Sequence, residues 1–223
     1  MPAANDDPGR RRILGAYNRA CLLSLAGVAA AFVGMAMAIR GVIELALVAL
    51  MLAGLADLFD GVLARRLRLS DYEKEFGVQL DTVVDAVAFV AAPVVIGLNA
   101  GPAGLPMLAG MALFVLAGVI RLAHFNTLSL RGADQSTHHR GLAVTYTALI
   151  FPLLFLLRDP LSSAAFQWLL GLAFPLLGLL FVLDVPIRKP RGVLYVILPL
   201  LAAALIAFWL WRFLQSADAM RGY

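Results

Sequence analysis

The chain has 223 residues, of which 62% are hydrophobic and 14% are charged, and its mean hydropathy is +0.88. A soluble domain with this composition would expose too much apolar surface, so the sequence indicates an integral membrane protein. The formal net charge is +4, but the basic residues lie between apolar runs and form no continuous patch with interleaved aromatic residues, so we expect no nucleic-acid partner.

The first residues are polar and end in three arginines, Arg10 to Arg12, ahead of apolar sequence that has no small-residue cleavage site. This pattern disfavours a cleaved signal peptide. We therefore expect a cytoplasmic juxtamembrane segment over residues 1–19, one membrane domain over 20–214 and a tail over 215–223.

Seven apolar segments are long enough to cross a bilayer, because a membrane helix needs about 20 mostly apolar residues. The sequence therefore predicts an all-α, polytopic bundle of six to eight transmembrane helices. The seven predicted spans are 20–39, 42–65, 77–99, 105–126, 141–157, 163–183 and 193–213.

The orientation of these spans follows from the lysines and arginines in their connections. With the amino terminus inside, 14 of the 18 basic residues lie on the cytoplasmic side. The other four are Arg40, Arg158, Arg212 and Arg221. This bias places the stretch from Asp57 to Asp85 at the cytoplasmic ends of the second and third spans.

That stretch carries four carboxylates in two pairs. Asp57 and Asp60 are three residues apart and Asp81 and Asp85 are four apart, so each pair shares one face of a helix. Two helices joined by a short connection would present the four carboxylates to each other.

Four like charges near a membrane need cationic partners, since each charge costs roughly 2.5–3.5 kcal/mol at the centre of a bilayer. Arg65 is one partner, but one guanidinium cannot neutralise four carboxylates. Carboxylate oxygens at this density suit one or two Mg²⁺ or Mn²⁺ ions, which typically act together with substrate phosphates. The sequence thus favours phosphoryl-group chemistry, and the small residues Gly61, Ala64 and Gly77 would leave room for a ligand.

The pattern D-x-x-D-G-x-x-A-R followed by G-x-x-x-D-x-x-x-D resembles the signature of the CDP-alcohol phosphotransferase family. All eight signature positions are present: Asp57, Asp60, Gly61, Ala64, Arg65, Gly77, Asp81 and Asp85. The insert from Arg68 to Lys74 and the run from Gly141 to Tyr146 resemble the serine-using phosphatidylserine synthase branch of that family.

The resemblance implies transfer of a phosphatidyl group from CDP-diacylglycerol to L-serine, with CMP as the second product. It implies two Mg²⁺ or Mn²⁺ ions on Asp57, Asp60 and Asp81, with Asp85 as a shared ligand or the catalytic base. It further implies a homodimer in the inner cell membrane, with membrane lipids around it and the active site facing the cytoplasm. The residues expected to bind the CDP group are Gly61, Ala64, Arg65 and Gly77, joined by Ser24.

Several residues leave alternatives open. Arg121 fits both a membrane anchor and a ligand for a phosphate or the acceptor carboxylate, and Asn126 fits both a helix cap and the site. We expect the adjacent His138 and His139 to be solvated and not to bind metal.

The sequence departs from the serine-using branch at Thr82, at Ala88 to Val90 and at Ala143, where an acceptor could bind. The nearest rival is therefore the same chemistry with glycerol 3-phosphate or inositol phosphate as acceptor. A cation-coupled transporter is the rival from another class, but the carboxylates cluster at one face and trace no path across the membrane.

Overall fold

The structure is a computed structural model that describes residues 14–101, 104–130, 138–188 and 194–221. Within these ranges six helices are long and apolar enough to cross a membrane, which confirms the predicted polytopic helical membrane protein. They are Arg19–Ile39, Ile43–Ala64, Asp71–Leu98, Leu105–Ser129, Ser163–Val182 and Val196–Ser216. The basic residues Arg10, Arg11, Arg12, Arg131, Lys189 and Arg191, used above for orientation, lie outside the described residues.

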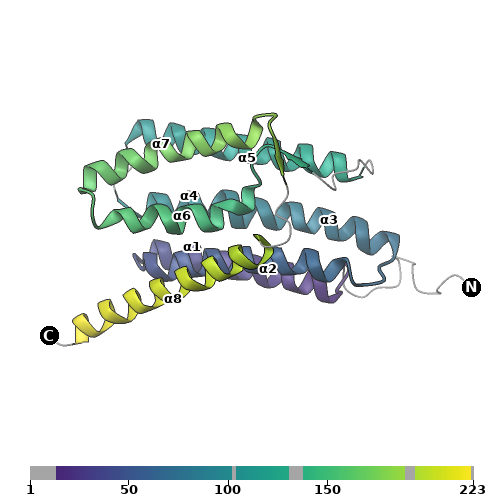
Figure 1. Cartoon of the computed structure of the whole chain (residues 1–223), viewed down its shortest axis with the longest axis horizontal. Helices are drawn as coiled ribbons and strands as arrows, with labels where there is room; N and C mark the ends of the chain where they lie inside the picture. Colours follow the sequence, from purple (N-terminus) through teal and green to yellow (C-terminus); the bar gives the residue numbers. More distant parts are fainter. Residues whose placement is uncertain (1–13, 102–103, 131–137, 189–193, 222–223) are drawn as a thin grey trace, which may run out of the picture.

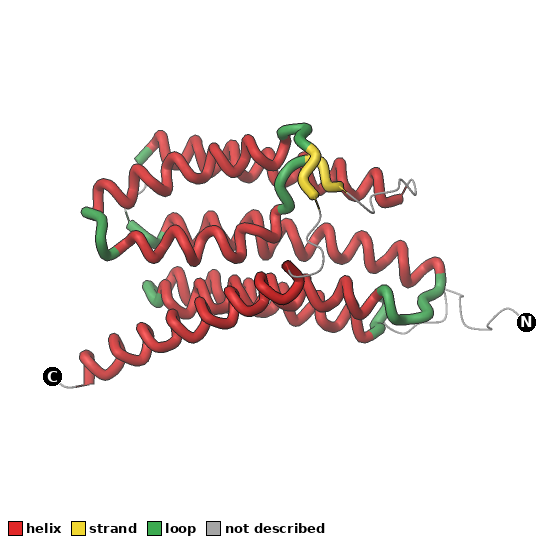
Figure 2. Tube along the Cα trace, in the orientation of Figure 1, coloured by secondary structure: helices red, strands yellow, loops and turns green. Residues whose placement is uncertain are grey.

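The described elements follow one another as helices apart from two short strands. The helices are α1 (Arg19–Ile39), α2 (Ile43–Ala64), α3 (Asp71–Asp85), the π-helical η2 (Ala86–Ala91), α4 (Ala92–Leu98), α5 (Leu105–Leu130), η3 (Val144–Tyr146), α6 (Thr147–Phe155), η4 (Leu156–Arg158), α7 (Ser163–Val182) and α8 (Leu194–Arg221). The strands β1 (His138–Arg140) and β2 (Pro186–Arg188) pair antiparallel, with His139 opposite Ile187 (Figure 2).

The helices run roughly along the long axis of the molecule and are stacked in tiers across it (Figure 1). Helices α5 and α7 pack on each other in one tier, and α1, α2 and α8 form the opposite one, with α3, α4 and α6 between them. The buried aromatic rings of Phe114, Phe151 and Phe174 connect α5, α6 and α7, with centroids 5.0 to 6.2 Å apart. This aromatic core fixes one half of the bundle, and α1 with α2 fixes the other.

Small residues bring α1 close to α2. A Cβ atom at Gly27 would lie 3.2 Å from the Cβ of Ala56, and one at Gly34 would lie 3.1 Å from the carbonyl oxygen of Ala46. Close backbone approach of this kind is typical of helix pairs in membranes, where packing replaces the hydrophobic effect as the driving force. The contact at Gly27 holds α1 against the half of α2 that carries Asp57 and Asp60, and the contact at Gly34 holds it against the first half of α2.

Helix α3 begins six residues before the predicted start of its span at residue 77. Ser70 and Glu73 form a capping box: the Ser70 hydroxyl accepts a hydrogen bond from the Glu73 amide, and the Glu73 carboxylate accepts one from the Ser70 amide. The polar segment that reads as a loop by hydropathy is therefore the first two turns of a helix, which extends α3 beyond its apolar part.

A π-helical turn, Ala86–Ala91, follows directly after Asp85. Such turns leave carbonyl groups without their usual helical partner and are frequent at functional sites. Here the buried Thr147 hydroxyl shares its hydrogen between the carbonyl oxygens of Phe89 and Val144, 3.1 and 2.8 Å away. This contact attaches the start of α6 to the segment that carries Asp85.

The predicted span at 141–157 is a shorter helical stretch, Val144–Arg158, which is shorter than each of the six long helices. Its start is set by Gly141, which has a φ of +73°, and a Cβ there would lie 2.4 Å from the carbonyl oxygen of Phe181. Only glycine fits this turn without strain.

Candidate metal and nucleotide site

Three of the four predicted carboxylates meet between α2 and α3. Asp57, Asp81 and Asp85 each offer an oxygen, and these three oxygens all lie within 4.8 Å of one another. Helical spacing puts Asp81 and Asp85 on one face of α3, and the hairpin between the helices brings that face to Asp57. We call these three side chains the carboxylate cluster.

The cluster carries no neutralising ion pair. Among the described residues, no lysine or arginine forms an ion pair with Asp57, Asp81 or Asp85. The buried Oδ1 atom of Asp85 has no hydrogen-bond partner within the described ranges, and Asp57 and Asp81 are half-buried. A buried carboxylate costs several kcal/mol unless it is paired or coordinates a metal. An oxygen-only donor set suits Mg²⁺ or Mn²⁺, so the residues present fit a divalent metal.

Asp60 is held apart from the other three carboxylates. Its side chain is buried, and it accepts a hydrogen bond from the buried Ser24 hydroxyl of α1. It is not part of the group of three oxygens described above. The predicted four-carboxylate set is thus, in this structure, a cluster of three with Asp60 beside it.

A cavity of about 410 Å³ opens beside Asp60 and Asp81, between α1, α2 and the start of α3. All the residues expected to bind the CDP group line it: Ser24, Gly61, Ala64, Arg65 and Gly77. A Cβ at Gly77 would meet no atom within 4 Å, and one at Gly61 would meet only Nη1 of Arg65, at 3.6 Å. These two glycines therefore face open space and do not mediate helix packing.

Seven further residues line this cavity that were not predicted as site residues, and three of them have a polar side chain or a thiol: Asn18, Cys21 and Lys74. Asn18 caps α1, since its Oδ1 accepts a hydrogen bond from the Cys21 amide at 3.0 Å. Lys74 forms an ion pair with Asp71, 2.8 Å away, on the first turn of α3. The position of Asn18 just before an apolar run predicts a helix cap. No sequence pattern predicts that Asn18 lies at the same cavity as Asp60.

Arg121 of α5 is buried and does not line this cavity. Its Nε donates a hydrogen bond to the carbonyl oxygen of Leu142, and its guanidinium lies 5.5 Å from the centre of the Phe125 ring. It also interacts electrostatically with Asp85. The burial of Arg121 disfavours the membrane-anchor alternative and favours the other one, a ligand for a phosphate or the acceptor carboxylate.

The remaining candidates lie on α3, α5 and β1. Asn126 donates a hydrogen bond from Nδ2 to Oε1 of Gln79 at 3.1 Å, so it connects α5 to α3 and does not cap a helix. The Thr82 hydroxyl donates to the carbonyl oxygen of Val78 at 2.9 Å. The backbone of His138 and His139 lies in β1, and their side chains are outside what the structure describes.

Residues 17–183 match the CDP-alcohol phosphatidyltransferase family. The match covers most of the chain, and the chain belongs to this family of membrane proteins.

Relatives at the level of single proteins are similar over smaller shares. The chain is 40% identical over 74 residues to the CDP-diacylglycerol–serine O-phosphatidyltransferase of Helicobacter pylori strain J99, which is 31% of this chain and 30% of that protein. It is 26% identical over 172 residues to the archaetidylserine synthase of Methanothermobacter thermautotrophicus, which is 76% of this chain and 68% of that protein. The chain thus matches under a third of the length of the Helicobacter relative.

Proposed function

We propose that the chain transfers a phosphatidyl-type group from a CDP-linked lipid to the hydroxyl of L-serine, giving a phosphatidylserine-type lipid and CMP. The observation that carries this proposal is that the carboxylate cluster lies at the edge of the cavity of about 410 Å³, which we call the nucleotide-sized cavity, and that no lysine or arginine in the described part of the chain is paired to it. The serine-using relatives support the choice of acceptor.

In the proposed reaction, a divalent metal held at the cluster would supply positive charge for the diphosphate and for the leaving oxygen. Asp57, Asp81 and Asp85 would hold it, with Asp60 completing the set once its side chain turns from Ser24. Gly61 and Gly77 would leave room for the nucleotide, and Arg65 would contact its phosphates.

Asp85 would act as the general base. The serine oxygen bonds to the phosphorus that carries the lipid, the bond from that phosphorus to the bridging oxygen breaks, and the electron pair leaves with CMP. The hydroxyl proton passes to the carboxylate of Asp85, whose Oδ1 has no other hydrogen-bond partner. The buried Arg121 would add positive charge near Asp85.

The distribution of basic residues supports a cytoplasmic active site in the inner cell membrane, where a CDP-linked donor and serine are both available. A homodimer belongs to the same proposal. Glycerol 3-phosphate and inositol phosphate are the alternative acceptors, and each adds a phosphate that needs basic partners.

The test is CMP release by the purified protein in detergent, with CDP-diacylglycerol, Mn²⁺ or Mg²⁺, and each acceptor in turn. Serine-dependent release that stops on addition of EDTA and in Asp85→Asn is the expected result. Release with a different acceptor would keep the chemistry and overturn the choice of serine, and no release with any acceptor would contradict the whole proposal.

A further inference from the structure

Thr147 is a polar residue that is completely buried at the start of α6, and the proposed reaction gives it no role. It does not line the nucleotide-sized cavity. It also does not line a second cavity, of about 200 Å³, which lies between α2, α6 and α8. Thr147 therefore touches no substrate in either cavity, and an effect on the reaction would have to act through the groups that it contacts.

The hydroxyl of Thr147 contacts a carbonyl group that has no α-helical donor. In an α-helix the carbonyl oxygen of Phe89 would accept a hydrogen bond from the amide four residues later, but that residue is Pro93, which has no N–H. The Thr147 hydroxyl donates to this oxygen at 3.1 Å and shares its hydrogen with the carbonyl oxygen of Val144. Pro93 thus excludes the α-helical bond and Thr147 adds another donor, so both favour the π-helical turn over a continuous α-helix.

The π-helical turn sets the direction in which α3 points its side chains. Each hydrogen bond in such a turn spans one residue more than in an α-helix, and one residue rotates a helix by about 100°. Packing fixes the segment beyond Asp85, since Phe89 and Ile96 are both 0% exposed. A continuous α-helix would therefore rotate Asp81 and Asp85 relative to that segment and would separate them from Asp57.

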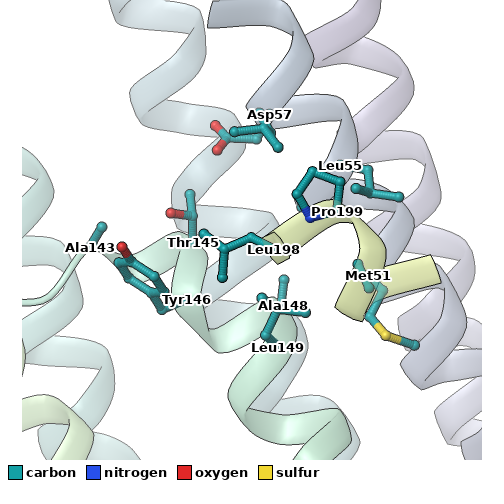
Figure 3. A pocket seen from close by; sticks show the side chains of 13 residues that line it. Met51, Leu55, Asp57, Ala143, Thr145, Tyr146, Ala148, Leu149, Leu198 and Pro199 are labelled. Carbon is teal, nitrogen blue, oxygen red and sulfur yellow. The ribbon is translucent and has the colours of Figure 1, made fainter. Parts of the chain in front are cut away.

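The start of α6 also contacts α2, one helical turn before Asp57. A Cβ at Gly54 would lie 2.6 Å from the Cβ of Ala148 and 3.8 Å from Cε1 of Phe89. Figure 3 shows Ala148 below Asp57, and both residues line the second cavity. The first turn of α6 is thus in contact with both sides of the carboxylate cluster: with α2 at Gly54 and with the continuation of α3 at Phe89.

We infer that Thr147 is a positioning residue for the carboxylate cluster. Its hydroxyl bonds to the carbonyl oxygen of Phe89, where Pro93 offers no amide. This bond holds the π-helical turn and keeps the carboxylates of α3 turned toward Asp57. The inference rests on the proposed function for its effect on the reaction, while metal binding and backbone exchange report on the position of the carboxylates directly.

The test removes the hydroxyl and keeps the shape of the side chain. Thr147→Val replaces the hydroxyl by a methyl group, and Thr147→Ser keeps the hydroxyl. Where Thr147→Val prevents folding, Thr147→Ala takes its place, because it differs from Thr147→Ser only in the hydroxyl.

Phe166→Leu is the control for a general loss of stability. Phe166 is 2% exposed and packs on Phe155 at the far end of α6, with ring centroids 5.2 Å apart. Each variant is compared in three ways: hydrogen exchange of the amides of residues 86–91 without metal, Mn²⁺ affinity with CDP-diacylglycerol, and kcat and KM for CMP release at saturating Mn²⁺.

In Thr147→Val the amides of the π-helical turn should exchange at least about tenfold faster, because the turn loses a hydrogen bond. Mn²⁺ should bind about five- to tenfold more weakly, and kcat should fall about tenfold or more, since a small misplacement of reacting groups is costly. The KM for the CDP-linked donor should stay within about twofold of wild type. Thr147→Ser should restore all three properties, and Phe166→Leu should lower the unfolding temperature without changing them.

Wild-type exchange and wild-type Mn²⁺ affinity in Thr147→Val would overturn the inference. A Thr147→Ser variant as impaired as Thr147→Val would also overturn it, because the hydroxyl would then not be the group that matters, and so would equal losses in Phe166→Leu. A wild-type protein that releases no CMP with any acceptor would contradict the proposed function alone, because hydrogen exchange and Mn²⁺ binding do not depend on turnover.

Discussion

The Ser24 hydroxyl on α1 donates a hydrogen bond to the Asp60 carboxylate on α2, at the boundary between the nucleotide-sized cavity and the carboxylate cluster. Both side chains are buried, so the carboxylate has little contact with water. In this structure α1 therefore provides a partner for the one carboxylate that lies outside the cluster of three.

Removal of this hydroxyl in Ser24→Ala should lower the free energy of unfolding by about 1.5–3 kcal/mol without metal, because a buried carboxylate loses its donor. Saturating Mn²⁺ should reduce that difference, since the metal then becomes the partner of Asp60. Thermal unfolding in detergent with and without Mn²⁺ measures both values. Ser24→Thr keeps the hydroxyl and is the control, and an equal loss with and without Mn²⁺ would contradict a metal-binding role for Asp60.

Gly77 should be needed for substrate binding and not for folding. A Cβ at this position meets no protein atom within 4 Å, and alanine stabilises a helix interior by roughly 0.5–1 kcal/mol relative to glycine. Gly77→Ala should therefore unfold at the same or a higher temperature while its KM for the CDP-linked donor rises severalfold. Unchanged KM in this variant would show that the nucleotide does not reach Gly77.

Gly54→Ala is the opposite case on α2. Its new Cβ would lie 2.6 Å from the Cβ of Ala148, so α2 and α6 would have to move apart. Overpacking of this kind costs about 1–3 kcal/mol, and the thermal unfolding temperature should fall. Stability equal to wild type would mean that α6 does not pack on α2 as closely as the structure has it.

The turn before η3 should tolerate no side chain. Gly141 combines a φ of +73° with a Cβ position 2.4 Å from the carbonyl oxygen of Phe181. Gly141→Ala should destabilise the protein by about 1–3 kcal/mol through backbone strain, with a further loss from the clash. Urea or thermal unfolding measures the change, and a neutral result would rule out this backbone conformation.

The ion pair between Asp159 and Arg212 links the loop before α7 to α8 and should give a small, pH-dependent contribution. The Arg212 guanidinium lowers the pKa of Asp159 below its ordinary value of 3.8. A carboxyl group with a lowered pKa in the folded state contributes stability above its unfolded pKa and loses it as the pH falls through the folded value. Because Asp159 is mostly exposed, Asp159→Asn should cost only about 0.2–1 kcal/mol at neutral pH. The difference from wild type should begin to shrink below about pH 4 and should disappear once the pH is below the folded pKa of Asp159, and a difference that grows with acidification would contradict the assignment.

Local patterns were sufficient to predict the parts of the molecule that depend on neighbours in sequence. Apolar run lengths predicted the six long helices, although the run at 141–157 proved to be a shorter helical stretch. The four-residue spacing predicted that Asp81 and Asp85 share a face of α3. Hydropathy failed at the start of α3, where the Ser70 capping box makes a helix from polar residues.

Contacts between distant segments could not be predicted in this way. The separation of Asp60 from the cluster depends on Ser24, 36 residues earlier, and the π-helical turn after Asp85 depends on a hydroxyl from Thr147. The same holds for the pairing of β1 with β2 and for the cavity lined by α2, α6 and α8. In both cases no sequence pattern indicates that these distant segments lie together.

The most direct test of the account is Mn²⁺ binding to the purified protein, followed by the loss of the free-ion signal in electron paramagnetic resonance. Wild-type protein with CDP-diacylglycerol should bind Mn²⁺, and the variants Asp57→Asn and Asp85→Asn should bind it at least about tenfold more weakly. The control is Asp71→Asn, which changes an exposed carboxylate on the same helix as Asp85 and should bind Mn²⁺ as wild type does. Wild-type protein that binds no Mn²⁺, or an Asp85→Asn variant that binds it equally well, would contradict the assignment of the carboxylate cluster as a metal site.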